Sequence, residues 1–163
     1  TSAIVTLALG DAIAVSIMEQ KNFSCSDYKI FHPGGKLGTK MLQAKDLMHT
    51  GKKIPIVSRD EPMKEVLIEM TTKSFGIAAV CFEDRLEGVI SDGDLRRNID
   101  GLLDKTAQDI ATESPQTISV NTFAIEALRI MNRNQISVLI VIDEQNSPIG
   151  ILHMHDLLRA GIA

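Results

Sequence analysis

Apolar and polar residues follow the same order twice between residues 44 and 163. Each half has a short apolar segment, then apolar residues at helical spacing, then two apolar runs separated by a polar turn. The runs GIAAVCF (76–82) and VLIVI (138–142) do not alternate with polar residues, which predicts strands covered on both faces. The pattern predicts an α/β (α+β) chain with two β-α-β-β-α repeats, over 44–101 and 107–163.

The predicted helices begin near Pro62 in the first repeat and after Val120-Asn121-Thr122 in the second. We expect buried stripes from Met63, Val66, Leu67 and Met70, and from Phe123, Ala127, Leu128 and Met131. Strands are expected at 54–58, 76–82, 86–91, 137–142 and 148–153, and closing helices from about 92 and over 154–160.

The residues themselves also recur. Gly88, Asp94, Leu95 and Arg97 return at the same spacing as Gly150, Asp156, Leu157 and Arg159, and Asp46-Leu47 returns as Asp109-Ile110. Repeated units of this kind pack against each other around a shared core. A cleft between the two copies, related by a pseudo-two-fold axis, is where a small ligand is expected.

Residues 1–43 stand outside the repeats. Helical spacing predicts an amphipathic helix over 2–20; Gly10-Asp11 interrupts it, and its apolar length falls short of the ~20 residues of a membrane span. A second short helix capped by Ser24 or Ser26 is expected next. The loop HPGGKLG (32–38) fits either a plain turn or a backbone that approaches a ligand closely. Because a helical pattern begins at once, we expect the chain to be part of a longer protein.

The charge and cysteine content narrow the possible partners. A net charge of −4 offers no electrostatic footprint for nucleic acid or for anionic membrane, so neither is expected as a partner. Cys25 and Cys81 are far apart, and Cys81 lies within an apolar run, as a buried free thiol does. These features predict a reduced, cytoplasmic protein.

The repeated acid is the leading candidate for binding chemistry. In each repeat an Asp follows the strand-ending glycine by six positions, near the start of a helix. Such a helix start suits a phosphate, and the carboxylates of Asp94 and Asp156 can accept hydrogen bonds from ribose hydroxyls. Ser91-x-x-Asp94 is also a capping box, which explains the same residues without a ligand. The two roles are compatible.

Histidines near the second acid raise the question of a metal. His153 and His155 precede Asp156, but alternating residues at a strand-to-helix junction need not converge, and a closed site takes about four ligands. We therefore expect no metal site there. His49 follows Asp46-Leu47-Met48 in a turn and is expected at the surface.

The tandem β-α-β-β-α units, each with Gly and then Asp at this spacing, resemble a pair of CBS domains over residues 44–163. Such pairs commonly bind adenosyl or other nucleotides between the copies, with Ser or Thr on phosphate and Asp on ribose. The resemblance implies that Ser91, Asp94 and Asp156 contact a nucleotide. His153 stands where the family has Ser or Thr, which implies one better site and one altered site.

Four segments of the chain together resemble the C-terminal part of D-arabinose 5-phosphate isomerases. They are LALGDAIAV, HPGGKLG, SDGDLRR and HMHDLLRAG. In them a sugar isomerase (SIS) domain precedes the CBS pair, and D-ribulose 5-phosphate and D-arabinose 5-phosphate are interconverted for Kdo of lipopolysaccharide or capsule. The resemblance implies that 1–43 ends the SIS domain and that His32 is an active-site residue. The resemblance also implies that the parent enzyme requires no cofactor. The other catalytic residues should lie upstream, so we expect this chain alone to be inactive.

Two functions from different classes follow from the resemblance. The CBS pair is either a regulatory module that binds a nucleotide or nucleotide-sugar effector, such as a CMP-linked pathway product, or a structural module without a ligand. In the second case it would hold protomers together, since CBS pairs dimerise through their helices and the isomerases are tetramers.

Overall fold

The structure is a computed structural model that describes residues 2–23 and 41–162. The chain divides into two units, Thr1–Met41 and Leu42–Ala163. The predicted second short helix, the HPGGKLG loop and His32 lie outside the described residues.

In the first unit, the predicted helix over residues 2–20 is confirmed as α1 (Ser2–Gln20). None of its residues is buried against the described part of the chain, so the buried side expected of an amphipathic helix is not found among residues 2–23 and 41–162. Its most apolar window has a mean hydropathy of 1.6, and by length and composition alone α1 is long and apolar enough to cross a membrane. This differs from the expectation that the helix falls short of a membrane span. A core helix of a soluble protein passes the same test.

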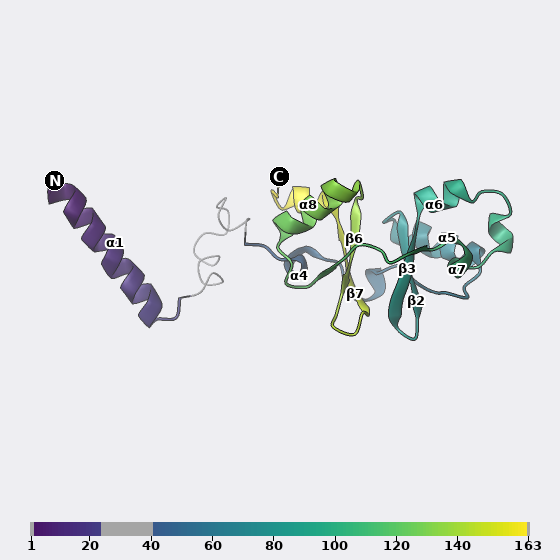
Figure 1. Cartoon of the computed structure of the whole chain (residues 1–163), viewed down its shortest axis with the longest axis horizontal. Helices are drawn as coiled ribbons and strands as arrows, with labels where there is room; N and C mark the ends of the chain where they lie inside the picture. The colour runs from purple at the N-terminus through teal and green to yellow at the C-terminus, as the bar shows by residue number, and fades with distance from the viewer. Residues whose placement is uncertain (1, 24–40, 163) are drawn as a thin grey trace. The chain divides into compact units, whose positions relative to one another are not determined.

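Two small sheets form the framework of residues 42–163, which confirms the α/β class (Figure 1). The strand order is β1-β2-β3-β4 in the first sheet and β5-β6-β7 in the second. In both sheets a parallel pair is followed by an antiparallel pair. The strands are Ile56–Ser58 (β1), Ile77–Phe82 (β2), Arg85–Ser91 (β3), Thr112–Glu113 (β4), Thr117–Ser119 (β5), Val138–Ile142 (β6) and Pro148–His153 (β7).

The helices lie on the outer sides of the two sheets (Figure 1). α5 and α8 connect the parallel strands of their sheets, whereas α6 and α9 follow the last long strand of each repeat. The helices of this unit are Ala44–Leu47 (α4), Met63–Lys73 (α5), Asp92–Arg97 (α6), Ala107–Ile110 (α7), Ala124–Asn134 (α8) and Met154–Arg159 (α9), with 3-10 turns at Gly51–Lys53 (η1) and Leu102–Asp104 (η2).

Three apolar clusters form the core. One joins the inner faces of the two sheets, and the other two pack the outer face of each sheet against the helices that cover it. β2 and β6 contribute to both kinds of cluster, which confirms that these continuous apolar runs are covered on both faces. The predicted buried free thiol of Cys81 is also confirmed: burial, and then Asp84 and Glu87, raise its pKa to about 11.

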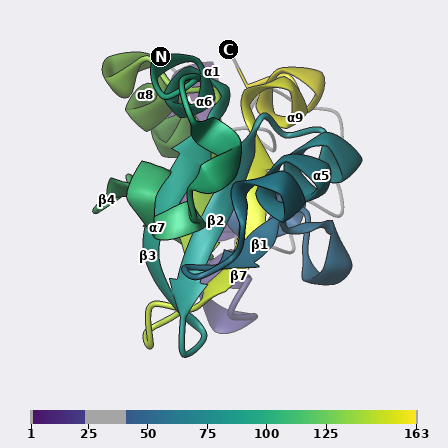
Figure 2. The ribbon, with the colours of Figure 1, turned by 90° about the vertical axis from the view of Figure 1, so that its right-hand side faces the viewer.

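The short leading helices are exchanged between the repeats. α4 belongs by sequence to the first repeat, yet the Ala44 N–H donates to the Thr122 carbonyl at 2.8 Å, and Ala44 lies in the core of the second repeat. Conversely, the Ala107 N–H at the start of α7 donates to the Glu61 carbonyl at 2.8 Å, and α7 packs into the first core. Figure 2 shows α5 and α7 in front of β2 and β3. Each repeat therefore completes the other.

After each leading helix the chain crosses the last long strand of the opposite repeat. His49 pairs with Ile151, and Thr112 pairs with Val89. The repeated glycines leave room for this crossing. A Cβ at Gly88 would lie 2.9 Å from the Thr112 carbonyl oxygen, and one at Gly150 would overlap Met48 Sδ.

Several predicted boundaries differ from the structure. Pro62 is the N-cap of α5 rather than part of its first turn, and Leu67 is only half-buried. Phe123 is the N-cap of α8 and is 49% exposed, so it is not part of the buried stripe. The edge strand β4 was not predicted, because two residues carry too little periodicity to be recognised.

We expect Gly88→Ala to lower the free energy of unfolding by about 1–3 kcal/mol, because the added methyl group meets backbone that must shift. Gly150→Ala is the matched control. Its new methyl group meets the flexible end of Met48, so the loss should be smaller. Urea denaturation of both variants measures this, and a larger loss for Gly150→Ala would contradict the crossing geometry.

Candidate functional site

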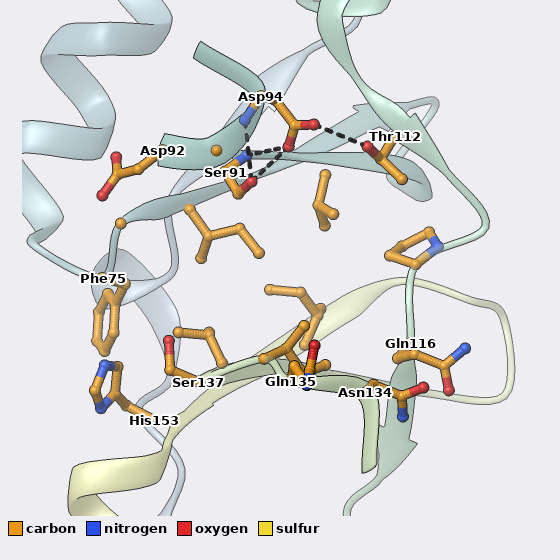
Figure 3. A pocket seen from close by; sticks show the side chains of 18 of the residues that line it. Phe75, Ser91, Asp92, Asp94, Thr112, Gln116, Asn134, Gln135, Ser137 and His153 are labelled. Carbon is orange, nitrogen blue, oxygen red and sulfur yellow. Dashed lines mark hydrogen bonds between the residues drawn. The ribbon is translucent and has the colours of Figure 1, made fainter. Parts of the chain in front are cut away.

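A cavity of about 800 Å³ lies between the two repeats, within the range of small-molecule sites. Apolar side chains from both sheets line its middle: Ile77, Val89, Val138 and Ile140. Polar groups line its two ends (Figure 3). The first repeat provides Ser91, Asp92, Asp94, Arg96 and Arg97, and the second provides Thr112, Gln116, Asn134, Gln135, Ser137 and His153.

Asp94 is the buried charge at the first-repeat end, with only 5% of its surface exposed. Ser91 is the N-cap of α6, and its hydroxyl accepts a hydrogen bond from the Asp94 N–H. In return the Ser91 N–H and hydroxyl donate to Asp94 Oδ2 at 2.8 and 2.6 Å. The predicted capping box is therefore present.

The other carboxylate oxygen of Asp94 has exchangeable partners. Its Oδ1 accepts from the Thr112 hydroxyl at 3.1 Å and from the Arg97 guanidinium. Burial acts to raise the pKa of Asp94, but hydrogen bonds from Ser91, Arg97 and Thr112 outweigh it and lower the pKa. Arg97 is 68% exposed and Thr112 is also exposed, so a ligand hydroxyl can replace either donor without disturbing the cap.

In the second repeat, Asp156 occupies the position that corresponds to Asp94, but its hydrogen-bond partner is different. His49 occupies the place of Thr112, with its Nε2 3.0 Å from Asp156 Oδ2. The expectation that His49 is a surface residue is therefore wrong: it is half-buried, because the crossing segment inserts it beside β7. His153 replaces Ser91 as the N-cap, and its Nδ1 accepts from the His155 N–H at 3.0 Å.

Four rings lie in a row at this end of the cavity. The ring centroids are 5.2 Å apart for His49 and Phe75, 6.4 Å for Phe75 and His153, and 4.6 Å for His153 and His155. Phe75 and His153 face the cavity in Figure 3. Burial is the largest cause that lowers the pKa of His153; His155, His49 and Arg159 add to this, whereas Asp156 opposes it. The lowered pKa and the hydrogen bond that Nδ1 accepts both favour the neutral form of His153.

Within residues 2–23 and 41–162, no group of three or more His, Cys, Asp or Glu side chains is arranged to hold a metal ion. The rings of His153 and His155 are tilted against each other, while Asp156 binds His49.

The structure brings three of the predicted site residues, Ser91, Asp94 and His153, to one cavity. Asp156 is not among the residues that line it, and His32 lies outside the described part of the chain. Sequence reasoning missed Thr112, Phe75 and the role of His49. Extending the match of Asp46-Leu47 with Asp109-Ile110 by two positions aligns His49 with Thr112, so that signal was present.

Comparison with known proteins identifies the class. Residues 44–101 and 107–163 match the CBS domain family model, and the chain belongs to this family. Its fold is similar to CBSX2 of Arabidopsis thaliana, solved in complex with AMP, with a TM-score of 0.64 and 24% identity over 73% of this chain and 95% of that chain. The CBS domain of a bacterial CNNM/CorC family Mg²⁺ transporter, in complex with ATP, has a TM-score of 0.65 and 19% identity over 76% and 89%.

More similar relatives cover the chain from end to end. Arabinose 5-phosphate isomerase KdsD of Yersinia pestis is 40% identical, and that of Pseudomonas aeruginosa is 41% identical, each over 99% of this chain and 51% of the relative. The chain thus spans about half the length of these relatives and corresponds to their C-terminal part.

We expect Asp94→Asn to lower the free energy of unfolding at pH 7 by about 1–3 kcal/mol, because an amide cannot accept all four hydrogen bonds. A carboxyl group with a lowered folded pKa stabilises above its unfolded pKa, and this stabilisation is lost as pH falls through the folded pKa. The difference in unfolding free energy between the variant and the wild type should therefore become smaller below about pH 4. Urea denaturation at pH 7 and in acid checks this, and an equal deficit under both conditions would contradict it.

The matched control is Asp109→Asn. Asp109 forms the same kind of capping box with Thr106, but it is exposed, so the loss should be smaller than at Asp94.

Proposed function

We propose that the cavity binds a nucleotide or nucleotide-sugar effector and that the chain is the regulatory part of a D-arabinose 5-phosphate isomerase. One observation carries the ligand proposal: a buried, ionised carboxylate stands at one end of an apolar slot large enough for a nucleotide. Related folds solved with AMP and with ATP support this ligand class.

In this proposal the ribose lies against Asp94. Its hydroxyls replace Thr112 and Arg97 as donors to Oδ1, while Oδ2 remains held by the cap of α6. Arg97, once released, and Arg96 face the same cavity and are free to bind phosphate. Ser91 joins them only after its hydroxyl rotates away from Asp94, because its proton is now donated there.

The base has its place in the apolar middle of the cavity. Ile77 and Val89 come from one sheet and Val138 and Ile140 from the other, so a flat ring between them would be covered on both sides. The amides of Gln116, Asn134 and Gln135 are polar groups that could read its edge. The second acid, Asp156, contributes less to ligand binding in this scheme because its carboxylate is already paired with His49.

The parent activity is proposed from the relatives. They align along the whole of this chain, including α1 and the HPGGKLG loop. We assign residues 1–43 to the end of an isomerase domain whose remainder covers the apolar side chains of α1. His32 then serves as an acid–base residue in the aldose–ketose reaction that supplies Kdo synthesis in the cytoplasm.

A structural role without a ligand is the alternative. Large apolar side chains remain exposed on the helical surface of the described residues, at Ile68 in α5, at Leu158 in α9 and at Phe123 before α8. In this alternative these side chains hold two copies of the pair together, and in the parent they help to form a tetramer.

We expect AMP, ATP, CMP or CMP-N-acetylneuraminate to raise the melting temperature of the chain. A ligand at 100 times its Kd adds about 2.7 kcal/mol. Asp94→Asn should abolish this shift, whereas Asp109→Asn, on the exposed capping box, should keep it. No shift with any of these ligands at millimolar concentration, together with a stable dimer by light scattering, would favour the structural alternative.

The chain alone should not interconvert D-ribulose 5-phosphate and D-arabinose 5-phosphate. An assay with D-ribulose 5-phosphate is expected to give no turnover above a buffer blank. Turnover that disappears in His32→Ala would overturn the assignment of the remaining catalytic groups to the other half of the parent.

A further inference from the structure

His153 gives the second-repeat end of the cavity a titratable group where the first repeat has Ser91. It lines the cavity, and its Nδ1 accepts the hydrogen bond that caps α9. A ring nitrogen that accepts an N–H carries no proton, so the neutral ring holds its proton on Nε2. Protonating the ring and keeping the α9 cap are therefore mutually exclusive.

The surroundings of His153 provide little compensation for a positive charge. His155 and Arg159 on α9 and His49 on the crossing segment all disfavour it. The nearby carboxylate of Asp156 favours it, but Asp156 Oδ2 is already engaged by His49. Phe75, on the remaining side, is apolar, and Asp92 lines the first-repeat wall of the same cavity. A second negative charge beside the ring would favour the protonated form of His153.

We propose that His153 takes up a proton from solvent when a ligand that carries a carboxylate or phosphate group binds in the cavity, so that binding strengthens as pH falls. The proposal rests on the proposed function, in which the ribose lies against Asp94 and the base fills the apolar middle of the cavity, and it adds that an anionic group of the ligand reaches His153. The protonated ring pairs with the anionic group through a charge-assisted hydrogen bond.

Proton uptake also gives binding a structural output. Once Nδ1 carries a proton it no longer accepts the His155 N–H, and the first turn of α9 loses its cap. α9 carries Asp156 and Leu157, and Leu157 belongs to the core of the second repeat. Binding of an anionic ligand thereby weakens the N-terminal cap of α9, a helix that the ligand need not contact.

Isothermal titration of the chain with UDP-glucuronate and UDP-glucose tests the proposal. The two sugars differ by one carboxylate, and neither has a phosphate monoester that titrates near pH 6. In buffers of different ionisation enthalpy the complex should take up a sizeable fraction of one proton, and the affinity should be about 3–10 times higher at pH 6 than at pH 8. CMP-N-acetylneuraminate repeats the test with a different base.

The two sugars separate the sources of the charge. Proton uptake with UDP-glucuronate but not with UDP-glucose would show that His153 pairs with the carboxylate. Equal proton uptake with both sugars would show that His153 pairs with a phosphate group. Binding without proton uptake for every ligand that binds overturns this proposal and leaves the nucleotide site intact. No binding by any of the three ligands, in a chain that still binds AMP or ATP, overturns this proposal alone, whereas no binding of any nucleotide overturns both.

Matched variants locate the proton. His153→Ser restores the residue that the first repeat has at this position and can still cap α9, so it should bind with an affinity that no longer depends on pH. His49→Thr, which copies Thr112 of the other crossing segment, and His155→Gln should keep the uptake. Uptake that persists in His153→Ser and disappears in His49→Thr would place the proton on His49 and overturn the proposal.

Discussion

The exchange of the leading helices is the constraint on which the rest of the structure depends. α4 fills the core of the second repeat and α7 fills that of the first, so neither sheet has a complete hydrophobic core without the other half of the chain. The same exchange sends a crossing segment over each repeated glycine. That segment delivers Thr112 to Asp94 and His49 to Asp156, and thereby fixes the partners of both acids.

A symmetric frame thus supports two chemically different ends of one cavity. At the Asp94 end, hydroxyl and amide donors lower the pKa of the carboxyl group and leave one oxygen with exchangeable partners. At the other end, imidazole rings take the places of both Ser91 and Thr112, and the acid behind them pairs with a histidine. The two repeats share this backbone geometry, while two differences of side chain place imidazole rings where the first acid has hydroxyl groups.

The sequence predicted the parts that depend on local pattern. Continuous apolar runs identified β2 and β6, and the Ser91–Asp94 spacing identified the cap of α6. The exchange could not be predicted in the same way, because an apolar stripe on α4 fits either repeat equally well. His49 was misplaced for this reason: its burial comes from β7, about a hundred residues away in the sequence, and not from its neighbours along the chain.

The exchange also affects how the chain is made. During synthesis α4 emerges long before α8 and β7, which form its docking surface, so it cannot pack there until β7 has been translated. The first repeat likewise waits for α7, which follows it in sequence. Closing such distant contacts is slow, and the pair is expected to complete its fold in one late cooperative step rather than repeat by repeat. A nascent chain of this design is expected to expose the apolar faces that α4 and α7 cover until α7, α8 and β7 have all been translated.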